Sequence, residues 1–115
     1  MKNIYMQNLE KRFERLKSEK LNYYNSMQQE IKKIKNIVKL YNLKKAVLFG
    51  SILNYEYFNT NSDLDIGIIG LNKSYFFKLY RELSLHLNIQ FDLIDLDDDD
   101  QFKQKIFQNC EVIYE

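Results

Sequence analysis

Apolar residues recur every three or four positions along the first 41 residues, a spacing that predicts amphipathic helix. Polar residues at Asn25 and Ser26 can cap a helix, so we expect one helix to about Asn22 and a second from Ser26 to Tyr41. We expect the second helix to pack on the chain's own core. The first should serve an intermolecular contact, because a core of this size leaves a long arm little to cover. The apolar stripe comprises Leu9, Phe13, Leu16, Tyr24, Met27, Ile31, Ile34, Val38 and Tyr41.

Strand and helix patterns alternate after this region, which predicts a small α/β or α+β sheet domain. A short helix is expected from Gly50-Ser51 to about Tyr57, and a second helix begins at a cap formed by Asn72 or Ser74. The predicted strands are KAVLF (45–49), DLDIGII (63–69), IQFDLIDL (89–96) and, as a short closing strand or tail, CEVIYE (110–115). The later helices are KSYFFKLYRELSLHLN (73–88) and DDDDQFKQKIFQ (97–108).

Composition and charge add a division of the chain into two parts. With 115 residues, 45% hydrophobic and 29% charged, the chain suits one globular domain at 26–115 preceded by a basic amphipathic arm at 1–25. No apolar stretch approaches the length of a membrane span, and the N-terminus lacks a signal-peptide core, so we expect a cytoplasmic protein without membrane contact. Residues 1–45 carry a net charge of +8 (12 basic, 4 acidic) and residues 46–115 carry −7 (5 basic, 12 acidic). The basic arm suits nucleic acid or an acidic partner, whereas the acidic half needs divalent cations to hold a polyphosphate.

Three aspartates are the candidates for chemistry. Asp63 and Asp65 stand two apart in a predicted strand and therefore point to one face, and Asp92 lies on the next strand. The chain has one Cys and one His, so a Cys/His zinc cluster is excluded and a metal must bind carboxylates, the ligands that Mg²⁺ prefers. Gly50 and Ser51 follow a buried strand, where free backbone N–H groups can hold phosphate. Together these residues predict a nucleotide site.

The stretch LFGSILNYEYFNTNSDLDIGI with FDLID resembles the minimal nucleotidyltransferase (MNT) domain of the polymerase-beta-like superfamily, over about residues 30 to 115. The resemblance implies a mixed β-sheet flanked by helices, binding of ATP and Mg²⁺, and transfer of a nucleoside monophosphate to a hydroxyl. Carried over, Gly50, Ser51 and Ser62 would bind the nucleotide, and Asp63, Asp65 and Asp92 would be the catalytic, metal-binding residues.

The resemblance also implies a partner, since MNT proteins are often antitoxins of HEPN-domain ribonuclease toxins and adenylylate (AMPylate) a tyrosine of the toxin. The family writes G-S-x-A-R-G, whereas this chain has Leu53, Asn54 and Tyr55 at the last three positions and a spacer of eleven residues before Asp63. Two alternatives therefore stand beside the antitoxin enzyme: a catalytically weak MNT-fold protein that neutralises its partner by occlusion, and a transferase acting on a small molecule. The N-terminal helices could also join copies into a homo-oligomer. Nucleic acid is not expected as the main ligand, because the chain lacks an aromatic platform interleaved with basic residues.

Overall fold

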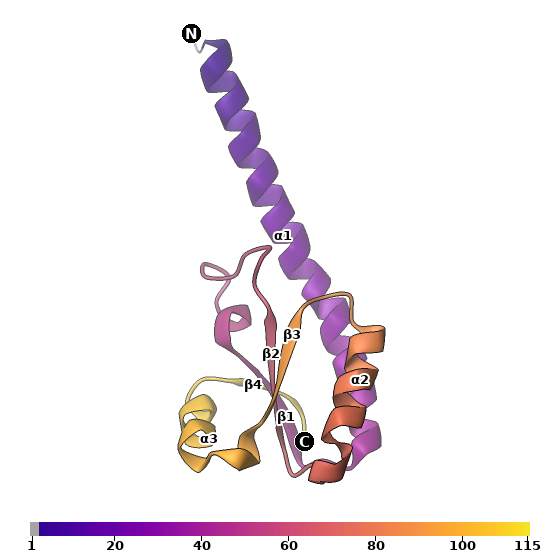
Figure 1. Ribbon diagram of the computed structural model, residues 1–115. Coiled ribbons are helices and arrows are strands. Elements are labelled where there is room, and N and C mark those ends of the chain that lie inside the picture. The colour runs from indigo at the N-terminus through magenta and orange to yellow at the C-terminus, as the bar shows by residue number, and fades with distance from the viewer. Residues whose placement is uncertain (1–2) are drawn as a thin grey trace.

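The computed structural model describes residues 3–115 as a long helix followed by a four-stranded sheet with two further helices (Figure 1). The α-helices are α1 (Ile4–Val38), α2 (Phe76–His86) and α3 (Asp100–Phe107), and the strands are β1 (Lys45–Phe49), β2 (Leu64–Ile69), β3 (Phe91–Asp95) and β4 (Glu111–Tyr114). Short 3₁₀ turns occur at Lys39–Tyr41, Gly50–Leu53, Lys73–Tyr75 and Leu96–Asp98. The α+β class expected from the sequence is confirmed.

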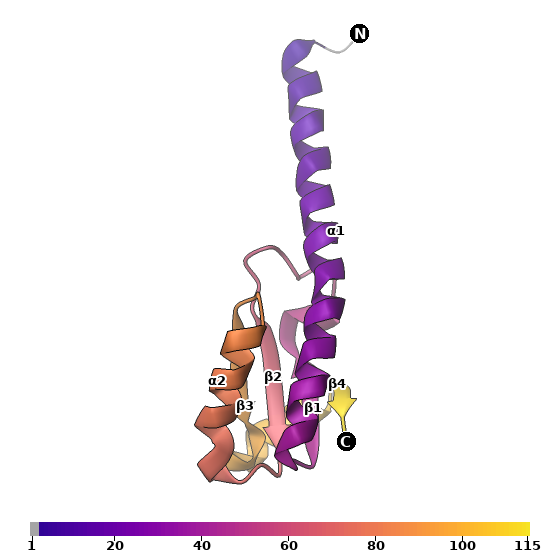
Figure 2. The ribbon, with the colours of Figure 1, turned by 90° about the vertical axis from the view of Figure 1, so that its right-hand side faces the viewer.

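The sheet is mixed, with strand order β3-β2-β1-β4. Strand β1 pairs antiparallel with both β2 and β4, and β2 pairs parallel with β3 through a crossover that contains α2. Helices α1 and α2 cover one face of the sheet (Figure 2), and Leu48 and Ile66 point into the core on that side. Val47 and Phe49 face the other way, into a smaller core with Leu96 and Ile106 of the α3 side.

The expected break in the N-terminal helical region is wrong, because α1 runs without interruption from Ile4 to Val38. The side chain of Ser26 does not cap a second helix; its Oγ donates to the carbonyl of Tyr23 at 2.6 Å, within the same helix. A serine that bonds back to the preceding turn is compatible with a continuous helix. The division into an arm and a domain at residue 25 therefore falls inside one helix.

Several other elements are shorter than predicted. The helix expected from Gly50 to Tyr57 is a 3₁₀ turn that ends at Leu53, and β2 begins at Leu64, so Asp63 lies just before the strand. The acidic helix begins only at Asp100, where Asp99 caps it by accepting from the N–H of Phe102 at 3.1 Å. The closing segment is a true strand, β4.

The N-terminal half of α1 projects beyond the sheet, and the structure is 64 Å long in its longest dimension (Figure 1). Only the C-terminal half packs on the core, through six buried residues: Met27, Glu30, Ile31, Ile34, Ile37 and Val38. Between residues 3 and 115, no helix has the length and apolar character that crossing a membrane requires.

Glu30 is a charged residue buried on the core-facing side of α1, with 5% of its surface exposed. One carboxylate oxygen accepts from Lys33 Nζ at 3.0 Å and the other from the backbone N–H of Asn88 at 3.0 Å. Lys33 in turn donates to the carbonyl of His86 at 3.3 Å. Glu30 and Lys33 thus attach α1 to the C-terminal end of α2, and the pairing satisfies the buried charge.

Replacing Glu30 by alanine should therefore lower the free energy of unfolding by about 1–3 kcal/mol, because it deletes a buried acceptor of two hydrogen bonds. Glu19→Ala on the same helix should cost less than about 0.5 kcal/mol. Glu19 is exposed, and its ion pair with Arg15 is weak because the two charged groups are 3.9 Å apart and solvated. Urea denaturation of both variants checks this expectation. Equal losses would show that the contact of Glu30 with α2 does not stabilise the fold.

Candidate functional site

Asp65 and Asp92 are brought side by side by the register of the sheet. In the parallel pair β2–β3, Asp65 is the cross-strand partner of Asp92, and in the antiparallel pair β1–β2 it is the partner of Phe49. Alternation along β2 turns Asp65 away from the core under α1 and α2, the face taken by Leu64 and Ile66. The two carboxylates therefore share one face, at the end of the sheet where β1 ends.

Gly50 places the turn after β1 directly against Asp65. Its φ is +78°, a conformation that favours glycine, and a Cβ built there would lie 2.2 Å from Asp65 Oδ2. A side chain at residue 50 would thus collide with the carboxylate. Glycine is required here both for the turn and for the close approach of the backbone, as the predicted phosphate-holding turn needs.

The pKa of Asp65 is raised from 3.8 to about 6. Burial is the largest cause, followed by the charge of Asp92, a hydrogen bond with Asp92 and the charge of Asp63. Two carboxylates that lie together without a cation raise each other's cost of ionisation. A divalent cation at this position would reverse that cost, because it favours the ionised form of each ligand.

Asp63 approaches the pair from the loop rather than from the strand. It is exposed and precedes β2, and it acts on Asp65 as a third negative charge. The neighbouring Ser62 uses its Oγ to accept from the N–H of Asn59 at 2.9 Å, so this predicted nucleotide-binding residue also shapes its own loop. Ser51 lies in the 3₁₀ turn, where its carbonyl accepts from the N–H of Asn54.

Tyr23 of α1 also contacts the candidate site, which its position in the sequence did not predict. Its hydroxyl donates to the carbonyl of Ser62 at 3.2 Å, and its pKa is raised by burial first, then by the charges of Asp63 and Glu30. Helix α1 therefore holds the loop immediately before Asp63. In the sequence, Tyr23 is visible only as one of two adjacent tyrosines at the apolar stripe. This pattern does not reveal a contact with a residue 39 positions away.

The loop between the Gly-Ser turn and the aspartates, residues 54–62, packs on α1 through aromatic side chains. Phe58 is fully buried, stacked on Tyr23 with ring centroids 5.3 Å apart and edge-on to Tyr24 at 5.3 Å. Tyr55 meets Tyr24 at 5.0 Å and lies under the ammonium group of Lys20 at 4.4 Å. This is the stretch in which the sequence departs from the G-S-x-A-R-G pattern, and its aromatic residues serve the contact with α1.

The structure thus unites Gly50, Asp65 and Asp92, with Asp63 near them. Within residues 3–115, no three His, Cys, Asp or Glu side chains are close enough together to form a metal site as they stand. The chemistry of the donors nevertheless fits Mg²⁺, because the set is all carboxylate. Asp65 and Asp92 are the residues that would hold the ion, with Asp63 added from the loop.

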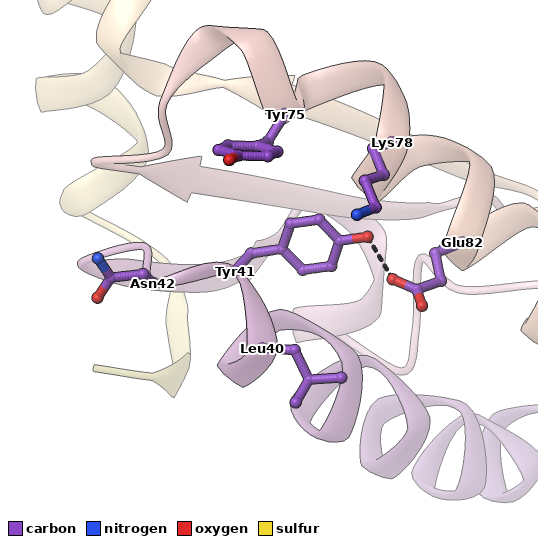
Figure 3. A pocket seen from close by; sticks show the side chains of 6 residues that line it. All are labelled: Leu40, Tyr41, Asn42, Tyr75, Lys78 and Glu82. Carbon is purple, nitrogen blue, oxygen red and sulfur yellow. Dashed lines mark hydrogen bonds between the residues drawn. The ribbon is translucent and has the colours of Figure 1, made fainter.

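A pronounced hollow on the described surface lies elsewhere. A cavity of about 520 Å³ lies between the end of α1 and α2, lined by Leu40, Tyr41, Asn42, Tyr75, Lys78 and Glu82 (Figure 3). The hydroxyl of Tyr41 donates to Glu82, and burial with this bond raises the pKa of Tyr41 to about 12. The cavity adjoins the start of β1, whereas Asp65 lies beside its end, so the cavity is separate from the carboxylates.

Residues 32–115 match the family model described as Polymerase beta, Nucleotidyltransferase. No curated protein and no solved structure matches the chain. The matched range starts within α1 and contains the whole sheet together with Gly50, Asp63, Asp65 and Asp92. It leaves out the projecting half of α1.

Asp65→Asn should stabilise the protein at neutral pH in the absence of divalent cations. The pKa of Asp65 is higher in the folded state than the ordinary 3.8, so its ionisation costs stability as the pH rises from about 4 through about 6. Two pKa units correspond to at most about 3 kcal/mol, and solvent screening of this half-buried group reduces the effect to the order of 1 kcal/mol.

Thermal unfolding in EDTA over pH 4 to 8 measures this difference. The Tm advantage of Asp65→Asn should be absent near pH 4 and complete above about pH 7. Glu56→Gln, in an exposed loop position, is the matched control and should show no such trend. A variant that is less stable than the wild type at every pH would contradict the raised pKa.

Proposed function

The chain belongs to the polymerase beta nucleotidyltransferase family, and on this basis we propose that it uses ATP and Mg²⁺ to transfer AMP to a tyrosine hydroxyl of a HEPN-domain toxin, for which it is the antitoxin. Nucleotidyl transfer as such is the activity of the family. The nucleotide, the metal and the acceptor are the proposed part. One observation supports them most directly: the Gly50 turn lies against the carboxylate of Asp65, beside Asp92.

Each of these residues has a role in the proposed reaction. The backbone of Gly50 and Ser51 would bind the triphosphate, and Asp63, Asp65 and Asp92 would hold the cation. Mg²⁺, when bound, supplies charge neutralisation between carboxylates and phosphates and orients the nucleotide. Asp92 accepts the proton of the acceptor hydroxyl as the oxygen attacks the α-phosphorus, and pyrophosphate leaves.

The openness of the site favours an acceptor on a protein. Asp63 and Asp92 are both exposed, and Asp92 stands on β3, the edge strand of the sheet. A hydroxyl on another folded protein can reach such a position. A small molecule would gain little there, because ligands of that size usually bind in enclosed cavities, and the cavity between α1 and α2 does not include the aspartates.

A second candidate function is inhibition of the partner by occlusion without catalysis. The causes that shift the pKa of Asp65 are burial and negative charges, with no Lys or Arg among them. The basic residue that the G-S-x-A-R-G pattern would supply is replaced by Asn54, whose side chain accepts from the N–H of Glu56 at 3.0 Å. The loss of a cation near the phosphates weakens transition-state stabilisation. This observation favours a slow or inactive transferase.

Incubation of the protein with α-labelled ATP, Mg²⁺ and the product of the neighbouring gene tests the proposal. We expect label on a tyrosine of that product, and Asp63→Asn/Asp65→Asn should reduce its rate at least about 100-fold, because the cation site is removed. Glu56→Gln provides the control and should transfer label at the wild-type rate. Undiminished transfer by the double variant would contradict the roles of the aspartates.

Protection of cells from the partner separates the two candidate functions. If transfer is the mechanism, the double variant should fail to protect cells although it folds. Protection retained by the double variant, with no label on the partner, would replace the enzyme by the occluding protein.

A further inference from the structure

Strand β3, which carries Asp92, forms one edge of the sheet, and no strand of the described chain pairs with its outer side. On its inner side, the N–H of Leu64 in β2 donates to the carbonyl of Gln90 at 3.0 Å. Bonds between parallel strands recur at every second residue, so Asp92 also directs its backbone groups toward β2. The N–H and C=O groups of Leu93 therefore point away from the sheet. An open edge of this kind can accept an added strand.

A hollow of about 400 Å³ lies beside this edge, between the beginning of α2 and the beginning of α3. Phe76 lines it from α2 and Phe102 lines it from α3. Leu93 and Ile94 line it from β3, although their side chains pack on opposite faces of the sheet. A hollow that is lined from both faces of an edge strand lies where the next strand would run. Its centre is about two residues, or roughly 7 Å along β3, from Asp92.

The charged groups around the hollow are mainly acidic. They are three aspartates and one lysine: Asp95, Asp98, Asp99 and Lys73. Lys73 Nζ is 3.9 Å from Asp95 and also contacts Asp98, whereas Asp99 accepts from the N–H of Phe102. One ammonium group thus faces three carboxylates beside apolar walls. This combination complements a lysine or arginine side chain, whose aliphatic stem can lie on the walls while its cation meets the carboxylates.

We propose that the acceptor protein docks by adding an extended segment to β3, with its acceptor tyrosine opposite Asp92 and a lysine or arginine two positions away in the hollow. This inference rests on the proposed transfer to a protein tyrosine, and it specifies how that protein is recognised. Backbone pairing with Leu93 supplies affinity, and the two side chains supply specificity. Side chains two apart on a strand point to one face, so both lie on the face that carries Asp92.

This docking places the tyrosine for the transfer step. Its oxygen forms a bond to the α-phosphorus of ATP, the bond from that phosphorus to pyrophosphate breaks, and the proton passes to Asp92. The added strand holds the tyrosine beside the carboxylate through backbone bonds on a regular element. The hydroxyl is thus oriented before the reaction begins, which lowers the entropic part of the barrier.

Two other uses of the sheet edges fit the structure less well. A second copy of β3 would bring Asp92 and Asp95 of both copies close together, and like charges on adjacent strands are destabilising. A segment added to the other edge strand, β4, would lie at the opposite side of the sheet from Asp92. A basic segment on β3 satisfies both the charge and the position.

Titration of the full chain with the product of the neighbouring gene, without ATP or divalent cations, tests the docking apart from the transfer. Amide hydrogen exchange followed by NMR should slow at Leu93 when the product binds, because this outward N–H gains an acceptor. Exchange in β4 should not change. Slowed exchange at an outward-facing amide is the signature of an added strand, which a contact between side chains alone would not produce.

Two variants test the edge and the hollow separately. Leu93→Pro removes the outward N–H and leaves the inward pairing with β2 intact. Asp98→Lys reverses a charge at the rim, where the Asp98 side chain is 62% exposed, so the variant should fold even if Leu93→Pro does not. Each should raise the Kd for the product by about tenfold. Glu111→Lys makes the same charge change on β4 and is the matched control, with the wild-type Kd expected.

The outcomes distinguish the docking from the proposed function. Unchanged exchange at Leu93 together with an unchanged Kd for Asp98→Lys would overturn the docking, and labelling of the tyrosine would still support the transfer. A product that slows exchange at Leu93 but receives no AMP would contradict the transfer and support the docking. Exchange at Leu93 that slows with rising concentration of the chain alone would assign the edge to a second copy and overturn the proposal.

Discussion

Asp65 lies on the central strand β2, opposite Phe49 of β1 on one side and Asp92 of β3 on the other. The rest of the site depends on this pairing, because it brings two carboxylates together. The register places two carboxylates on adjacent strands. The turn at Gly50, which follows β1, lies so close to Asp65 that a side chain at residue 50 would not fit. The protein therefore concentrates negative charge beside a strip of backbone that can receive phosphate. Burial first, and then the neighbouring carboxylates, raise the pKa of Asp65, and a divalent cation would favour its ionised form.

Helix α1 connects this site to the rest of the molecule. Its buried Glu30, with Lys33, fastens it to the end of α2, and Tyr23 fastens it to the loop just before Asp63. The aromatic residues of the loop 54–62 replace the pattern expected after the Gly-Ser turn, and they form the contact with the helix. The residues that differ from the G-S-x-A-R-G pattern and the loop that follows them therefore serve to pack on α1. The same helix continues past the sheet. Its projecting half and Tyr23, which contacts the loop before Asp63, therefore belong to one continuous helix.

The sequence predicted the class of fold, three strands and a closing strand or tail, because alternation along a strand and the spacing of apolar residues are local properties. It did not predict that Asp65 and Asp92 are cross-strand partners, since that depends on the register of β2 with β3. It did not predict that α1 is continuous: the polar residues at Asn25 and Ser26 are consistent with a cap, and only the bond from Ser26 to Tyr23 shows that they lie within a helix. The contact of Tyr23 with Ser62 could not be predicted either, since it joins segments 39 residues apart and depends on the packing of the loop. The placement of Asp63 before the strand rather than in it also follows from that loop.

If Asp65 and Asp92 form a cation-binding pair, the pKa of Asp65 must depend on Mg²⁺, and the ionisation of Asp65 with and without Mg²⁺ tests this most directly. Carbon-13 NMR of the aspartate carboxyl groups, with Asp65 assigned from the Asp65→Asn spectrum, gives its pKa in each condition. We expect a pKa of about 6 without metal and a clear decrease when Mg²⁺ is added, because the cation favours the ionised ligand. A pKa near 3.8 without metal, or one that Mg²⁺ leaves unchanged, would contradict the account.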